Sequence, residues 1–123
     1  MSEKPLILCA DDDEDILSLI GLRLERAGYE VLTARDGSEA IAAARERRPA
    51  VMVLDVMMPR LKGDEALREL RADPALRDMK VILLSTRVQE SDVERGFAAG
   101  ADAYLTKPFK SSELVGKIEE LLG

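Results

Sequence analysis

Val51-Met-Val-Leu-Asp55 is apolar at four successive positions and ends in a carboxylate. A short run that is apolar throughout, instead of at every second position, is typical of a strand buried on both faces of a parallel sheet. Val81-Ile-Leu-Leu-Ser85 repeats this pattern and ends in a hydroxyl. The two runs therefore predict a parallel sheet that carries helices on both faces.

Outward from these runs, short apolar segments alternate with longer helical patterns along the chain. The other strands are predicted over Leu6–Ala10, Glu30–Ala34 and Ala103–Thr106. Apolar residues at helical spacing predict helices over Ile16–Ala27, Ser38–Arg47, Asp64–Ala72, Ser91–Ala99 and Ser112–Leu122. This alternation predicts a single α/β domain over residues 1–123, with five parallel strands in a doubly wound sheet.

Composition narrows the range of functions. A net charge of −6 and an aromatic content of 3% argue against nucleic acid as a partner, because such binding uses basic surfaces and stacking rings. The absence of histidine excludes Ser-His and Cys-His catalysis and ordinary zinc sites. Cys9 is the only cysteine, so no internal disulfide can form, which suits a reducing compartment. The first residues lack an apolar signal core, and no apolar run approaches the length of a membrane span. We therefore expect a cytoplasmic protein without a membrane partner.

Carboxylates stand directly after two of the predicted strands. The acidic run 11–15 follows the first strand, and Asp55 ends the third. Helix capping is the ordinary explanation of such a run, and Asp13 or a later residue can supply the cap while Asp11 and Asp12 face the site. Neighbouring carboxylates repel one another, and a hard divalent cation relieves that repulsion. Oxygen ligands without His or Cys predict Mg2+, with Mn2+ as the alternative.

A hydroxyl and a lysine stand at the ends of the last two strands. Ser85 ends the fourth strand and Lys107 follows the fifth. Together with the carboxylates they supply an acceptor, a metal site, a hydroxyl donor and a compact cation, as phosphoryl transfer requires. Converting Asp55 to an acyl phosphate would leave the site about one charge more negative. That imbalance is a physical reason for the hydroxyl and the lysine to move inward, and so for a switch.

Four segments together resemble the receiver domain of bacterial two-component response regulators. They are ILCADDDEDIL (Ile7–Leu17), VMVLDVMMP (Val51–Pro59), VILLST (Val81–Thr86) and GADAYLTKPF (Gly100–Phe109). In this order and spacing the motifs are strongly specific, and the resemblance extends from Leu6 to Leu122. It implies a flavodoxin-like (βα)5 fold with strand order 2-1-3-4-5.

The resemblance also implies a role for each residue of the site. Asp55 would be the phosphoryl acceptor, with Ser85 and Lys107 as the catalytic hydroxyl and lysine. Ser85 would act as a switch together with Tyr104, which would rotate into the space that the hydroxyl vacates. The peptide bond between Lys107 and Pro108 would be cis.

The same resemblance implies how Mg2+ is held. Asp12 would be a direct ligand, while Asp11 would act largely through water. Asp55 itself and the backbone carbonyl of Met57 would complete the protein ligands.

The function implied is that of a phosphoacceptor switch, not of a conventional enzyme. The domain would catalyse its own phosphorylation and its own slow dephosphorylation. Its donor would be a sensor histidine kinase or a phosphotransfer protein. A downstream protein would bind the face made by Ser91–Ala99, the last strand and Ser112–Leu122.

Three alternatives remain open at this point. The chain could be a receiver-like interaction module without phosphorylation, although the expected polar residues are all present. It could be a Mg2+-dependent phosphohydrolase, although no insertion is long enough for a substrate-binding cap. It could also be the N-terminal receiver fragment of a larger regulator.

Overall fold

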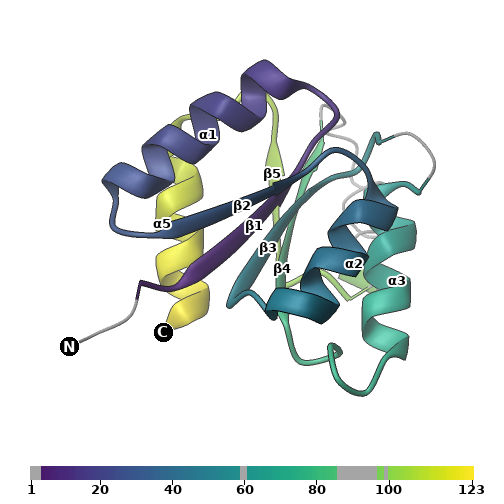
Figure 1. Ribbon diagram of the computed structural model, residues 1–123. Helices are drawn as coiled ribbons and strands as arrows, with labels where there is room; N and C mark the ends of the chain where they lie inside the picture. The colour runs from purple at the N-terminus through teal and green to yellow at the C-terminus, as the bar shows by residue number, and fades with distance from the viewer. Residues whose placement is uncertain (1–3, 59–60, 86–96, 99) are drawn as a thin grey trace.

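Five parallel strands form one sheet at the centre of the structure, a computed structural model that describes residues 4–58, 61–85, 97–98 and 100–123 (Figure 1). The strands are β1 (Leu6–Ala10), β2 (Glu30–Ala34), β3 (Val51–Asp55), β4 (Lys80–Ser85) and β5 (Ala103–Thr106). Their order is β2-β1-β3-β4-β5. The predicted fold class and strand order are confirmed, and only β4 begins one residue earlier than the sequence indicated.

Helices cover both faces of this sheet. They are α1 (Glu14–Arg26), α2 (Gly37–Arg47), α3 (Gly63–Ala72) and α5 (Ser111–Leu122). Helices α1 and α5 lie on one face, and α2 and α3 lie on the other (Figure 1). Most of the helix expected over Ser91–Ala99 lies outside the described residues. Within that range the structure describes Phe97 and Ala98, and both are helical. No helix in the described part of the chain is long and apolar enough to cross a membrane.

Two apolar layers fill the space between the sheet and its helices. Successive residues of β3 contribute to opposite layers, because side chains alternate across a strand. Met52 and Leu54 pack with α2 and α3, whereas Val51 and Val53 pack with α1 and α5. All four side chains are fully buried. A strand covered on both faces has no solvent-facing position, which explains the unbroken apolar run.

The four helices α1, α2, α3 and α5 begin one or two residues before their predicted starts. Helix α1 begins at Glu14 because Asp13 caps it. Asp13 Oδ1 accepts hydrogen bonds from the backbone N–H groups of Asp15, at 3.0 Å, and Ile16, at 3.3 Å. The helix begins with the acidic residues Glu14 and Asp15, which suit the positive end of the helix dipole but carry no apolar signal.

Candidate functional site

Four strands bring polar side chains to one edge of the sheet. Asp11 follows β1, Asp55 ends β3, Ser85 ends β4 and Lys107 follows β5. Asp11, Asp55 and Ser85 are buried, and Lys107 is partly buried. Because parallel strands share one carboxyl edge, the Lys107 ammonium group reaches a carboxylate 96 positions away in the sequence. The structure therefore gathers residues that the sequence places far apart.

Asp11, Asp12 and Asp55 form an acidic cluster. One carboxylate oxygen of each lies within 4.8 Å of the others. Asp12 is exposed, so this side of the cluster is open to water. Asp13 caps α1 instead, and its backbone N–H donates to Asp11 Oδ1 at 3.0 Å. Hard oxygen donors with access to water fit Mg2+, which keeps several of its waters when a protein binds it.

Lys107 connects the two buried carboxylates. Its Nζ lies 2.7 Å from Asp11 Oδ2 and 3.3 Å from Asp55 Oδ2. Burial acts to lower the pKa of Lys107, but the hydrogen bond to Asp11 and the charges of both carboxylates raise it above its ordinary value. The ammonium form is therefore stable here, and it places a compact positive charge beside the carboxylate of Asp55. The peptide bond from Lys107 to Pro108 is cis, as the sequence resemblance implied.

The carboxyl group of Asp55 is held in an environment that disfavours its charge. Burial and the nearby charge of Asp11 raise the pKa of Asp55 from 3.8 to about 6. The charge of Lys107 and a 3.3 Å hydrogen bond from the backbone N–H of Met57 act in the opposite direction. A bound cation would favour the ionised form further, because it adds positive charge next to the carboxylate.

Two glycines outside the acidic cluster form hydrogen bonds to backbone carbonyls of residues that follow Asp55. The N–H of Gly63 donates to the carbonyl of Val56 at 3.1 Å, and the N–H of Gly37 donates to the carbonyl of Leu61 at 3.2 Å. A Cβ atom on Gly37 would lie 2.3 Å from that Leu61 oxygen. Sequence reasoning gave neither glycine a role, and the only available signal was a glycine at each helix start.

Ser85 and Tyr104 lie on adjacent strands and on the same face of the sheet. Tyr104 pairs with Leu83, and Ser85 pairs with Thr106, so the hydroxyl and the ring are diagonal neighbours. Tyr104 is partly buried and packs against the apolar layer on the α2 and α3 side. The register thus makes Tyr104 a neighbour of Ser85 across the two strands, and the coupling of their movements stays a prediction.

The chain is similar to known proteins of one family. The family model described as the response regulator receiver domain matches residues 7–119. Transcriptional regulatory protein PrrA of Mycobacterium tuberculosis is 44% identical over 118 residues, which are 96% of this chain and 50% of that protein. The chain thus spans about half the length of the curated relatives it matches.

Solved structures agree with the observed fold. A putative response regulator from Chloroflexus aurantiacus aligns with a TM-score of 0.93 at 32% identity, covering 98% of each chain. The receiver domain of sensor histidine kinase PA1611 from Pseudomonas aeruginosa aligns with a TM-score of 0.90 at 31% identity, covering 98% of this chain and 99% of that one. The PA1611 structure has a magnesium ion coordinated in its active-site cleft.

Proposed function

The chain belongs to the response regulator receiver domain family, and from this premise we propose that Asp55 is its phosphoryl acceptor. The observation that carries the proposal is the position of Lys107 Nζ, at 2.7 Å from Asp11 and 3.3 Å from Asp55. A partly buried lysine between two carboxylates supplies positive charge where a phosphoryl group would arrive. The presence of acceptor, acidic pair, hydroxyl and lysine at one edge favours this function over an interaction module without phosphorylation.

The reaction is a transfer of one phosphoryl group to a carboxylate. An oxygen of Asp55 forms a bond to phosphorus, while the bond between phosphorus and the donor's leaving atom breaks and its electron pair departs with that atom. Lys107 interacts with the phosphoryl oxygens as charge accumulates on them. Ser85 donates its hydroxyl hydrogen bond to one of these oxygens. Slow hydrolysis of the resulting acyl phosphate returns Asp55 to its carboxylate form.

The acidic cluster would hold the metal ion that this chemistry requires. We propose Asp12 as a direct ligand because it is exposed, and Asp11 as a ligand largely through water because both of its oxygens already accept hydrogen bonds. Asp55 and the backbone carbonyl of Met57 complete the set. Mg2+ bound there would offset negative charge on the acceptor and on the phosphoryl oxygens. Mn2+ prefers the same oxygen donors and is proposed as a substitute.

The donor proposed for this chain is a sensor histidine kinase or a phosphotransfer protein. Receiver domains interact with such proteins, and the chain contains no histidine of its own to carry the phosphoryl group. We propose a cytoplasmic location, where such donors present their phosphohistidines. For the output, we propose a protein partner that binds β5 and α5, because Tyr104 lies on β5. The rest of the predicted partner face, residues 91–96 and 99, lies outside the described residues.

Labelling with a small donor tests the assignment of Asp55. Purified protein incubated with acetyl phosphate and Mg2+ should gain one phosphoryl group by intact mass. Asp55→Asn should gain none, because an amide is not a nucleophile. The matched control is Asp78→Asn, which removes an exposed aspartate and should label like the wild type. Labelling of Asp55→Asn to wild-type stoichiometry would place the acceptor elsewhere.

A further inference from the structure

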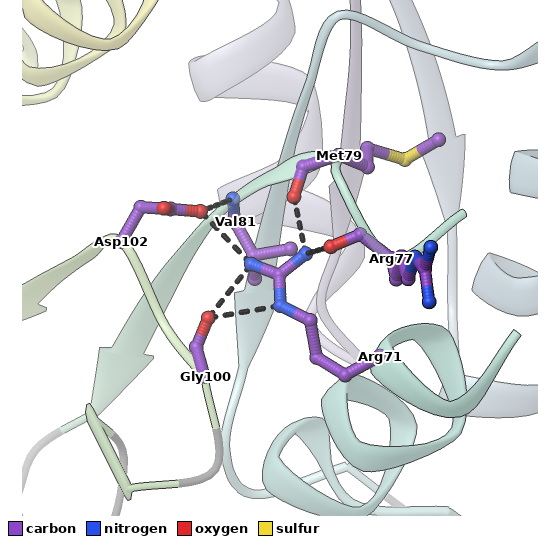
Figure 2. A network of polar contacts seen from close by, with 6 residues as sticks. All are labelled: Arg71, Arg77, Met79, Val81, Gly100 and Asp102. Carbon is purple, nitrogen blue, oxygen red and sulfur yellow. Dashed lines mark hydrogen bonds and ion pairs between the residues drawn. The ribbon is translucent and has the colours of Figure 1, made fainter. Parts of the chain in front are cut away.

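Arg71, in the last turn of α3, makes five hydrogen bonds (Figure 2). Its Nη1 donates to the carbonyls of Arg77, at 2.9 Å, and Met79. The carbonyl of Gly100 accepts from Nε at 3.0 Å and from Nη2 at 2.7 Å, and Nη2 also donates to Asp102 Oδ2 at 2.9 Å. A guanidinium group has five N–H donors, so Arg71 uses all of them. Such complete use indicates a fixed side chain.

Asp102 extends this network into the sheet. Its backbone N–H donates to the carbonyl of Val81 at 2.9 Å, and its Oδ2 accepts from the N–H of Val81 at 2.8 Å. The same Oδ2 atom receives the bond from Arg71 (Figure 2). Asp102 is therefore bonded to β4 through both its main chain and its side chain. Arg71 holds it there, immediately before β5 begins.

The register of β5 against β4 determines where Lys107 lies in the site. Strand β5 is four residues long and, among the described strands, pairs with β4 alone, at the edge of the sheet. Lys107 follows directly, and its backbone N–H donates to the carbonyl of Ser85 at 2.7 Å. A strand advances about 3.3 Å per residue, so a slip of two residues would move Lys107 by roughly 6.6 Å. That displacement would remove its contacts with both carboxylates.

Helix α3 extends from the carboxyl edge of the sheet to its amino edge. Its first residue, Gly63, donates to the carbonyl of Val56 next to Asp55. Its last turn carries Arg71. A helix of ten residues is about 15 Å long. The first residue of α3 therefore contacts the end of β3, which carries Asp55. The last turn of α3 contacts Asp102, immediately before β5, which precedes Lys107.

We propose that Arg71 is a positioning residue for phosphoryl transfer, because it holds β5 in the register that places Lys107 between Asp11 and Asp55. The proposal rests on the function proposed above for Asp55 and Lys107. Arg71 itself touches no reacting group, since it lies at the amino ends of β4 and β5. Its effect on the rate must therefore pass through Lys107.

A double-mutant cycle tests this route. Arg71→Met should slow labelling by acetyl phosphate roughly tenfold, because a displacement of about 1 Å at a reacting group can cost up to 100-fold. Lys107→Ala should slow it by roughly 100-fold, the cost of one lost charge-stabilising donor. If Arg71 acts through Lys107, Arg71→Met should then change the rate of Lys107→Ala by less than about twofold. Losses that multiply would overturn the proposal.

Two further variants keep the test decisive. Arg45→Met is the control, because Arg45 also pairs at this end of α3, with Asp73 at 3.4 Å, and is exposed; its rate should equal that of the wild type. Should Arg71→Met not fold, Arg71→Lys enters the same cycle, since lysine keeps a charge beside Asp102 but has only three donors at one point.

Amide exchange adds a readout that does not depend on labelling. Arg71→Lys should speed exchange of the Lys107 N–H while leaving the amides of β1 unchanged, and unchanged exchange at Lys107 would overturn the proposal. The two proposals can fail separately. A wild-type protein that is not labelled on Asp55 would refute the proposed function. Labelling on Asp55 combined with multiplying losses would refute only the role of Arg71.

Discussion

A Cβ atom on Gly63 would lie 2.4 Å from the backbone carbonyl oxygen of Asp55. Non-bonded carbon and oxygen atoms do not approach this closely, so only glycine fits at the first residue of α3. The helix can therefore sit directly against the end of β3, with the Gly63 N–H bonded to the carbonyl of Val56. The proposed acceptor and the helix that follows it are in backbone contact.

Gly63→Ala should consequently disturb both stability and metal binding. Overpacking of this kind costs about 1–3 kcal/mol, and here the displaced atoms are backbone atoms of Asp55 and Val56. We expect a lower free energy of unfolding in urea and weaker Mg2+ binding by calorimetry.

Gly116→Ala is the matched control for this substitution. Gly116 lies inside α5, and a Cβ atom there would meet nothing within 4 Å. Alanine should stabilise that helix by roughly 0.5–1 kcal/mol and leave Mg2+ binding unchanged. Equal stability of Gly63→Ala and Gly116→Ala would contradict the close contact.

Two neighbouring acidic residues at the start of α3 should respond oppositely to alanine. Asp64 has a buried Oδ1 atom without a hydrogen-bond partner among the described residues. Removing it relieves a desolvation cost of about 1–3 kcal/mol and loses a helix-dipole gain of about 0.3–1 kcal/mol. Asp64→Ala should therefore raise the free energy of unfolding, measured in urea.

Glu65→Ala provides the comparison. Glu65 Oε1 accepts a hydrogen bond from the N–H of Lys62 at 3.1 Å, and its side chain is exposed. Losing this capping interaction should lower the free energy of unfolding by roughly 0.5–1 kcal/mol. If both alanine variants are destabilised equally, the buried oxygen of Asp64 is not a cost to the fold.

Helix starts also show what a sequence can and cannot predict about this fold. The strands were readable as short runs that are largely apolar and are followed by polar residues, and Val51–Asp55 has the bounds that the sequence indicated. The start of α1 was placed two residues late, because Glu14 and Asp15 carry no apolar periodicity. Capping is a local hydrogen-bond property, and only the position of Asp13 in the acidic run hinted at it.

The ionisation of Asp55 should make stability depend on pH in metal-free protein. Its pKa is raised to about 6 in the folded state, by burial first and by the charge of Asp11 second. The folded state thus binds this proton more tightly than the unfolded state does. The corresponding stability is fully present below about pH 4 and is lost as the pH rises through about 6.

Asp55→Asn cannot ionise and so escapes this loss. Without metal, the variant should be more stable than the wild type near pH 8, and the difference should shrink toward pH 4. Urea unfolding in the presence of a chelator measures it. Saturating Mg2+ should reduce the difference near pH 8 by stabilising the ionised wild type. A gap that does not change with pH would show that the carboxyl group is not perturbed.

The candidate site was partly visible in the sequence for a clear reason. Residues that follow strands were found because parallel strands end at one edge, and Asp55 and Lys107 indeed lie 3.3 Å apart. Arg71 was not found, because its five bonds join it to Arg77, Met79, Gly100 and Asp102 through contacts that no local pattern encodes. An arginine in the last turn of a helix reads as an ordinary surface residue until the fold is known.

The last prediction concerns how phosphorylation reaches the face of β5 and α5. Ser85 is buried at the end of β4, where its hydroxyl can donate to a phosphoryl oxygen on Asp55. Tyr104 is its diagonal neighbour and already packs partly into the apolar layer. A tyrosine tolerates both buried and exposed positions, because its ring is apolar and its tip is polar. We therefore expect Tyr104 to turn inward when Ser85 moves toward the phosphoryl group.

Fluorine NMR can follow this movement with one probe. Tyr29 and Tyr104 are the only tyrosines, so 3-fluorotyrosine in a Tyr29→Phe background labels Tyr104 alone. Beryllofluoride with Mg2+ should shift the resonance of Tyr104, and Asp55→Asn should abolish the shift. Ser85→Ala should reduce it, because the hydroxyl that draws Ser85 inward is gone. A free-energy difference of a few kcal/mol between the two ring positions is enough to move most of the population. An equal shift in Ser85→Ala and the wild type would mean that Tyr104 responds to Asp55 by a route that bypasses the hydroxyl.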